Sequence, residues 1–307
     1  MYGNYGFDAP EALKSVLEGF SIHPGDRGEV VVLLLLCLAR DLAVKRAPSD
    51  SRIVTVSQFM ENLLKDNALK THKPSVWTER TRDETFQMNF GDSWIHCTHF
   101  IKVHEHKLIN RKYLWALMFR AAGIICGNGQ AGVDVIIPYL YKCKVLRRLC
   151  VGSILIQVKN DRKFTGVPDE DLFLRMDPQG LGMFDVGEQP VPVIRILFAL
   201  AAAPSSLTYM KPSKSASTFT SYDFWCAGIN PDVLVPVTLG KLSTWAALLQ
   251  ASRPWQAVYT GEKEESTLKR SSNPGAGTNN AHWAKWVSFG AAEDIQDDFE
   301  ETSDCST

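Results

Sequence analysis

The chain has 307 residues, of which 45% are hydrophobic and 22% are charged. This balance is typical of a folded globular protein and excludes a collagen-like or wholly disordered chain. The formal net charge of −1 conceals an asymmetry, because residues 293–307 contain seven acids and no lysine or arginine, which leaves residues 1–292 with a net charge of +6. We therefore expect an acidic, disordered tail behind a mildly basic body.

The cysteines and the apolar runs bear on where the protein resides. The seven cysteines include no CxxC pair, so a disulfide framework is not expected. The longest apolar run, Val30–Ala39, has ten residues, whereas a bilayer span needs about 20. This run also lacks the position and flanks of a signal peptide. We expect an intracellular protein, nuclear or cytoplasmic, without contact to a membrane.

The first half of the chain is predicted to be mostly helical. Residues 1–25 form an N-terminal extension, and the predicted domain covers residues 26–260. Apolar periodicity and turn-forming residues give this order of elements: a buried helix over 30–46, a helix over 56–65, a loop or insertion over 66–93, a strand over 94–103 and a helix over 110–125.

The second half is predicted to contain the buried strands. Continuous apolar runs predict strands, and Pro, Ser and Thr predict loops. The expected segments are strands over 133–140, 153–159 and 191–202, a loop over 204–218, a compact aromatic segment over 219–228, a helix over 239–251, and a linker with the acidic tail over 261–307.

Two of these strands contain polar residues that need an explanation. Asp134 interrupts an apolar strand just after a glycine-rich turn, and Gln157 and Lys159 lie two residues apart in another. Side chains alternate along a strand, so Gln157 and Lys159 point to the same face. Burying an unpaired charge is costly. The three side chains are therefore expected to converge at a sheet edge, where oxygen atoms can hold a divalent cation.

An Asp followed some twenty residues later by (Asp/Glu/Gln)-x-Lys resembles the PD-(D/E)XK nuclease superfamily. Gly132-Val133-Asp134-Val135-Ile136 with Gln157-Val158-Lys159 is most similar to the Mrr-like restriction endonucleases, which use Gln-x-Lys. Together with Arg27-Gly28-Glu29 and Tyr222-Asp223-Phe224-Trp225-Cys226, these segments also resemble uncharacterised nuclease-like proteins of mushroom-forming fungi. The resemblance implies an α/β fold with a central mixed sheet flanked by helices.

The resemblance also implies a function, namely metal-dependent endonucleolytic hydrolysis of phosphodiester bonds, with DNA as the expected substrate. Glu29, on the first core helix, would join Asp134 and Gln157 as ligands of Mg²⁺ or Mn²⁺, and Lys159 would complete the catalytic set. The basic residues between the two strands, Lys142, Lys144, Arg147 and Arg148, are expected to contact nucleic acid. Gln157 stands where most of the superfamily has an acid, so the alternative is an inactive nuclease-fold module that binds nucleic acid or a partner protein.

Each candidate also has a purely structural interpretation. Asp26-x-x-Glu29 before an apolar run is typical of a helix capping box. Asp134 is consistent with a turn residue, Gln157 and Lys159 with a strand end that reaches solvent, and the basic stretch with a solvated loop. The glycines of 127–132 spell GxGxxG, but they follow a helix and precede a strand, which is the reverse of a dinucleotide-binding fingerprint.

Overall fold

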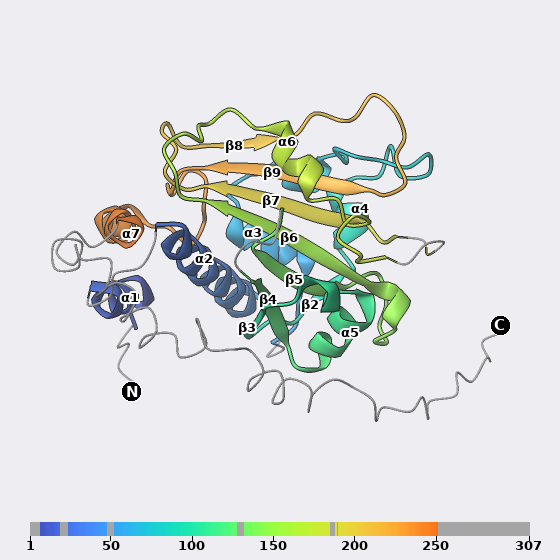
Figure 1. Cartoon of the computed structure of the whole chain (residues 1–307), viewed down its shortest axis with the longest axis horizontal. Helices are drawn as coiled ribbons and strands as arrows, with labels where there is room; N and C mark the ends of the chain where they lie inside the picture. The colour runs from blue at the N-terminus through green and yellow to red at the C-terminus, as the bar shows by residue number, and fades with distance from the viewer. Residues whose placement is uncertain are drawn as a thin grey trace, which may run out of the picture. The chain divides into compact units, whose positions relative to one another are not determined.

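Across the residues that the computed structural model describes, nine strands form one mixed sheet with helices on both faces (Figure 1). The described residues are 7–18, 24–47, 52–127, 132–184, 188 and 190–250, and they lie in one compact unit. The expected α/β class with a central mixed sheet is thereby confirmed. The segment 261–307, predicted to be a linker and acidic tail, lies outside the described residues.

The strands and helices have the following bounds. The strands are β1 (Val54–Thr55), β2 (Trp94–Ile95), β3 (His99–Val103), β4 (Ala122–Cys126), β5 (Val135–Leu140), β6 (Val151–Lys159), β7 (Val193–Ala199), β8 (Ser206–Tyr209) and β9 (Ser221–Ala227). The helices are α1 (Ala9–Glu18), α2 (Pro24–Arg46), α3 (Val56–Leu63), α4 (Phe86–Phe90), α5 (Arg111–Phe119), α6 (Glu170–Arg175) and α7 (Leu242–Leu249). Within these ranges no helix is long and apolar enough to cross a membrane.

The order of the strands determines which of their ends meet. The main path through the sheet is β1-β2-β5-β6-β7-β9-β8, and β4 pairs with both β3 and β5. β5 and β6 are antiparallel, whereas β6, β7 and β9 run parallel. The beginning of β5 and the end of β6 therefore lie at the same edge of the sheet.

Two apolar cores cover the two faces of the sheet. Alternate residues of β6 divide between them: Ile154 and Ile156 belong to the core that α2, α3 and α4 cover, and Leu155 belongs to the core under α5 and α6. Figure 1 shows α3 and α4 behind the strands and α5 and α6 in front of them. Burial on both faces explains why the central strands read as continuous apolar runs rather than as alternating ones.

The predicted helix over 110–125 is wrong in its second half. The helix α5 ends at Phe119, Ala121 adopts a positive φ of 51°, and Ala122–Cys126 continues as β4. β4 pairs with β3 on one side and β5 on the other. Its tertiary pairing therefore overrides the helical spacing of its apolar residues, and its β-branched Ile124 and Ile125 suit a strand.

Segment 66–93, interpreted from sequence as a loop or insertion, contributes to the core. Phe86 and Phe90 of α4 are fully buried and contact the ring of Tyr222 edge-on. Asn89, also buried, donates a hydrogen bond of 2.8 Å to the Tyr222 hydroxyl. The largely polar composition of the segment did not indicate this, because few of its large apolar residues, among them Leu69, Phe86 and Phe90, enter the core.

Several smaller boundaries also differ from the prediction. The expected strand over 94–103 is divided into β2 and β3, β8 lies within the expected loop 204–218, and α6 falls in a stretch for which no element was predicted. The compact aromatic segment 219–228 contains the parallel strand β9.

Candidate active site

Asp134 lies directly before β5, at the sheet edge where β6 ends. Its backbone N–H donates to Ile156 and its carbonyl accepts from Cys126, at 2.8 Å each. Its side-chain Oδ2 accepts a 2.6 Å hydrogen bond from the backbone N–H of Val158. These contacts fix the half-buried carboxylate against the end of β6, and Oδ1 has no hydrogen-bond partner among the described residues.

A glycine two residues earlier permits this geometry. Gly132 has a φ of +92°, and a Cβ atom there would lie 2.3 Å from the carbonyl oxygen of Arg175. A side chain is therefore excluded by both conformation and space. The last glycine of the 127–132 motif thus has a structural function, while residues 128–131 lie outside the described part.

Glu29 reaches the same edge from α2. The preceding residue, Gly28, packs so closely on β6 that a Cβ atom would lie 2.9 Å from Asn160 Cβ and 3.1 Å from Val158 Cγ1. Only glycine allows this approach of the helix, and the approach places the next residue, Glu29, at the end of β6.

The capping-box interpretation of Glu29 is wrong. α2 begins at Pro24, a residue suited to the first helical position. Asp26 and Glu29 therefore both lie inside the helix, and Asp26 cannot be the residue that caps its start.

Electrostatic interactions link Glu29 to Asp134 and Lys159. Burial, followed by the negative charges of Asp134 and Asp26, raises the pKa of Glu29 to about 7, against smaller opposing effects of Lys102 and Lys159. Burial also raises the pKa of Asp134, although the Val158 N–H and the charge of Lys159 act in the opposite direction. The structure thus brings two carboxylates and a lysine into one electrostatic cluster.

The charges of this cluster are not paired with one another. Within the described residues, neither the Glu29 carboxylate nor the Lys159 ammonium forms a hydrogen bond or an ion pair, although both side chains are half-buried. Half-buried charges without partners cost free energy. The cluster is therefore poorly explained as a device for stability.

Gln157 contributes an oxygen atom that is buried without a partner. The side chain is 4% exposed, and its Oε1 accepts no hydrogen bond from the described residues. Gln157 and Lys159 lie on the face of β6 that bears Leu155, whereas α2 covers the opposite face, so Glu29 approaches around the end of the sheet. An orphaned amide oxygen is the kind of ligand that Mg²⁺ or Mn²⁺ accepts together with carboxylates.

The carboxylates alone do not form a complete metal centre. Among the described residues there is no group of three or more His, Cys, Asp and Glu side chains placed to hold a metal ion. A cation at this edge would therefore depend on Gln157 Oε1 as its third protein oxygen, together with Glu29 and Asp134.

The basic residues predicted to contact nucleic acid lie away from the candidate site. Lys142, Lys144, Arg147 and Arg148 are all exposed in the loop between β5 and β6, a segment that we call the basic hairpin. The antiparallel pairing of Leu140 with Val151 puts this loop at the opposite end of the two strands from Lys159. At about 3.3 Å per residue, the separation is roughly 20 Å or more. Their predicted contact with nucleic acid stays a prediction, and it concerns a surface remote from Lys159.

Two other cations lie at the site's edge and were missed from sequence. Lys102 of β3 is exposed and lies level with Ile125, which in turn pairs with Val135, one residue after Asp134. Arg162 is exposed three residues after Lys159. No sequence signal marked Lys102, because its position depends on the pairing of β3 with the wrongly predicted β4.

Comparison with known proteins identifies no relative: no family model matches the chain, and neither does a curated protein or a solved structure.

Proposed function

We propose that the protein is a metal-dependent nuclease that hydrolyses phosphodiester bonds in nucleic acid, with DNA as the first substrate to test. One observation carries the proposal: Glu29 and Lys159, which have no hydrogen-bond or ion-pair partner among the described residues, gather with Asp134 at the end of β6, the strand that also bears the orphaned oxygen of Gln157. Holding these groups together costs free energy when no ligand is bound, whereas a bound cation or phosphate would compensate their charges. Such an arrangement is typical of a functional site.

The donor set suits a hard divalent cation. Two carboxylates and an amide oxygen are ligands typical of Mg²⁺ and Mn²⁺. When bound, such a cation supplies Lewis-acid stabilisation of the charge that develops on a phosphate. It would also offset the repulsion from Asp134, which adds to the effect of burial in raising the pKa of Glu29. One neutral ligand leaves two negative charges in the site, so we expect weaker metal affinity than in an all-carboxylate site.

Lys159 has the position of a group that acts on the phosphate. It follows Gln157 by two residues on the same face of β6, half-buried at the strand's last position. Its ammonium group, which has no ion-pair partner among the described residues, can donate hydrogen bonds to a phosphate oxygen or hold the attacking water in line. The packing of Gly28 against Val158 and Asn160 keeps this end of β6 in place.

Contacts with the substrate backbone are assigned to cations at the same edge. Lys102 and Arg162 are exposed there, on a strand and a loop that flank the cluster. Such contacts position a nucleic acid without reading its sequence. We therefore assign contacts with the scissile strand to Lys102 and Arg162.

The test is cleavage of supercoiled plasmid and of single-stranded DNA with Mg²⁺ or Mn²⁺, in the wild type and in Lys159→Ala. Loss of about 3–5 kcal/mol of transition-state stabilisation would slow cleavage by about two to four decades. The matched control is Lys45→Ala, because Lys45 is exposed and lies 16 residues along α2 from Glu29, about 24 Å away. This control should cleave like the wild type.

The same assay distinguishes an active nuclease from an inactive module that only binds nucleic acid. If the wild type binds DNA but cleaves it at no metal concentration, the protein is an inactive nuclease-fold module. If Lys45→Ala and Lys159→Ala lose activity equally, the assigned site is wrong.

A further inference from the structure

A pocket lies at the end of the sheet opposite to the proposed active site. It is formed by the loop around residues 73–83 and the loop around residues 212–214, and its volume is about 470 Å³. Val76 bridges to Ser221 at the beginning of β9, and the strand register sets Ser221 level with Val193 and therefore with Ser153. Lys159 is six residues further along β6, about 20 Å away.

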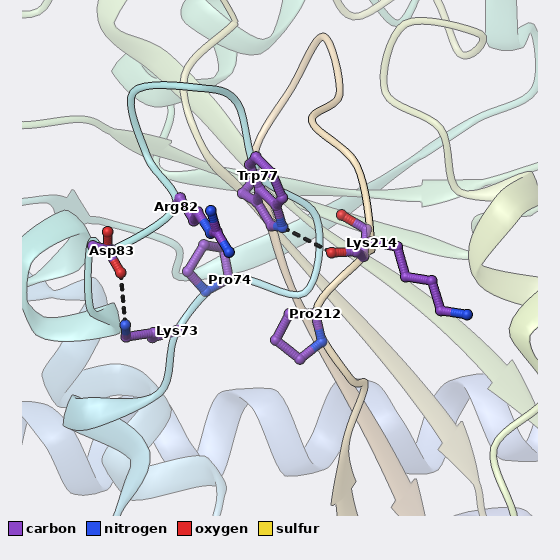
Figure 2. A pocket seen from close by; sticks show the side chains of 8 residues that line it. Lys73, Pro74, Trp77, Arg82, Asp83, Pro212 and Lys214 are labelled. Atoms are coloured by element: carbon purple, nitrogen blue, oxygen red, sulfur yellow. Dashed lines mark hydrogen bonds and ion pairs between the residues drawn. The ribbon is translucent and has the colours of Figure 1, made fainter.

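The pocket has apolar walls of fixed position. Trp77 is 8% exposed and its indole N–H donates a 3.0 Å hydrogen bond to the carbonyl of Ser213, which joins the two loops. The backbone N–H of Ser213 in turn donates to the carbonyl of Ser75 at 2.7 Å. Figure 2 shows Pro74 and Pro212 on either side of the space below the indole. These flat, rigid surfaces fit the face of a sugar or a nucleobase.

The charged groups of the pocket are predominantly positive. The lining contains Lys73, Arg82 and Lys214 and a single carboxylate, Asp83, which Lys73 already pairs at 2.7 Å. The lining therefore has a net charge of +2. It suits an anion that also carries an apolar, planar part.

Arg82 is the residue best placed to bind that anion. Its guanidinium carbon lies 5.1 Å from the centre of the Trp77 ring, and it has no hydrogen bond or ion pair with the described residues. Figure 2 shows Arg82 beside Pro74 and Trp77, with Lys214 at the opposite rim. A stacked arginine keeps its donors free for a phosphate and loses little conformational entropy when it binds one.

The basic hairpin lies at the same end of the sheet as this pocket. The hairpin joins β5 to β6, and β6, β7 and β9 are neighbours, so both project from one edge. Figure 1 shows the hairpin and the two pocket loops on the right-hand side of the sheet. A polymer with regularly spaced phosphates can contact both groups of cations, whereas a small anion cannot.

We propose that this pocket binds one nucleotide unit of a nucleic-acid strand, with its phosphate on Arg82, a neighbouring phosphate of the strand on Lys214 at the opposite rim, and its sugar or base against Trp77, Pro74 and Pro212. The choice of a nucleic acid as ligand rests on the proposed function. The pocket is thus a second contact, remote from the cleavage site, that holds substrate along the molecule.

The experiment is fluorescence anisotropy of a labelled single-stranded decamer of thymidylate, in EDTA so that no cleavage occurs. Arg82→Ala with Lys214→Ala should raise Kd about tenfold and reduce the slope of log Kd against log salt by about 1.4, because each lost phosphate contact on a single strand removes about 0.7. An abasic decamer of equal charge should bind the wild type several-fold more weakly, because it lacks stacking. Arg52→Ala is the matched control, since Arg52 is exposed before β1 at the other side of the sheet, and it should change neither quantity.

Three results would overturn the inference: an unchanged Kd in the double variant, equal binding of the abasic and normal decamers, or tighter binding of a hexaglutamate peptide than of the decamer. The two proposals fail separately. Binding that depends on Arg82 without any metal-dependent cleavage would refute the nuclease, whereas cleavage without Arg82-dependent binding would refute the pocket.

Discussion

Replacing Glu29 by glutamine should stabilise the protein in a pH-dependent manner. The pKa of Glu29 is raised from 4.5 to about 7, first by burial and then by Asp134 and Asp26. Below pH 4.5 the carboxyl is protonated in both the folded and the unfolded chain, so its ionisation affects neither. Between pH 4.5 and 7 only the folded chain retains the proton, and the free energy of unfolding therefore falls as the pH rises. Above pH 7 the carboxylate is charged in both states, and its burial then lowers the free energy of unfolding by the full amount.

The magnitude follows from this shift. A difference of about 2.5 pKa units corresponds to roughly 3.4 kcal/mol, and partial exposure to solvent reduces it to about 1–2 kcal/mol. Glu29→Gln removes the ionisation, so it should gain about 1–2 kcal/mol at pH 8 and nothing at pH 4. For a chain of this size the gain corresponds to a Tm increase of about 3–6 °C.

The assay is thermal unfolding of Glu29→Gln and wild type at pH 4, 6 and 8 in EDTA, with Glu105→Gln as the control because Glu105 is exposed. The Tm of the wild type should approach that of Glu29→Gln as the pH falls. The Tm of Glu105→Gln should equal that of the wild type at each pH. Adding Mn²⁺ at pH 8 should raise the Tm of the wild type but not that of Glu29→Gln. A variant that is less stable than the wild type at pH 8 would show that the Glu29 charge has a structural partner, and the reasoning would fail.

Three further variants test the fold and the assignments. Gly28→Ala should lower the free energy of unfolding by about 1–3 kcal/mol, because the added Cβ would overlap the packed end of β6. Urea denaturation measures this loss. Unchanged stability would mean that α2 does not approach β6 so closely. Asp223→Ala should cost about 3–5 kcal/mol by the same measurement, since Arg195, which donates to both carboxylate oxygens, would stay buried without its counter-ion; a loss under 1 kcal/mol would contradict this. The double variant Arg147→Ala with Arg148→Ala should raise KM for plasmid cleavage and leave kcat unchanged, because the basic hairpin lies far from Lys159. A large fall in kcat would show that the hairpin takes part in the cleavage step.

The sequence was most informative where burial controls the pattern. The strand over 135–140 is apolar throughout and that over 193–199 is apolar except for Arg195, which pairs with Asp223, so a nearly continuous apolar run identified each of them. The strand over 122–126 was predicted as helix because its apolar residues continue the spacing of α5, and only the positive φ of Ala121 and pairing with β3 and β5 separate the two elements.

The candidate site, too, was predictable from sequence only where a local pattern marks its residues. Asp134, Gln157 and Lys159 could be selected from sequence because each polar residue interrupts a run that must be buried. The remoteness of the basic hairpin from Lys159 also follows from two antiparallel strands joined by a loop. Lys102 and the pocket around Trp77 depend on long-range pairing, and no local pattern predicts them.

The most direct test of the proposed metal site is Mn²⁺ binding, measured by the loss of the free-ion signal in electron paramagnetic resonance. The wild type is expected to bind one Mn²⁺ per chain at this edge, and Asp134→Asn should weaken that binding at least about tenfold, the usual order of effect when a metal site loses part of its support. Glu105→Gln should bind like the wild type. Equal binding by the wild type and Asp134→Asn, or no binding by the wild type at millimolar Mn²⁺, would contradict the assignment of Glu29, Asp134 and Gln157 as a metal-dependent active site.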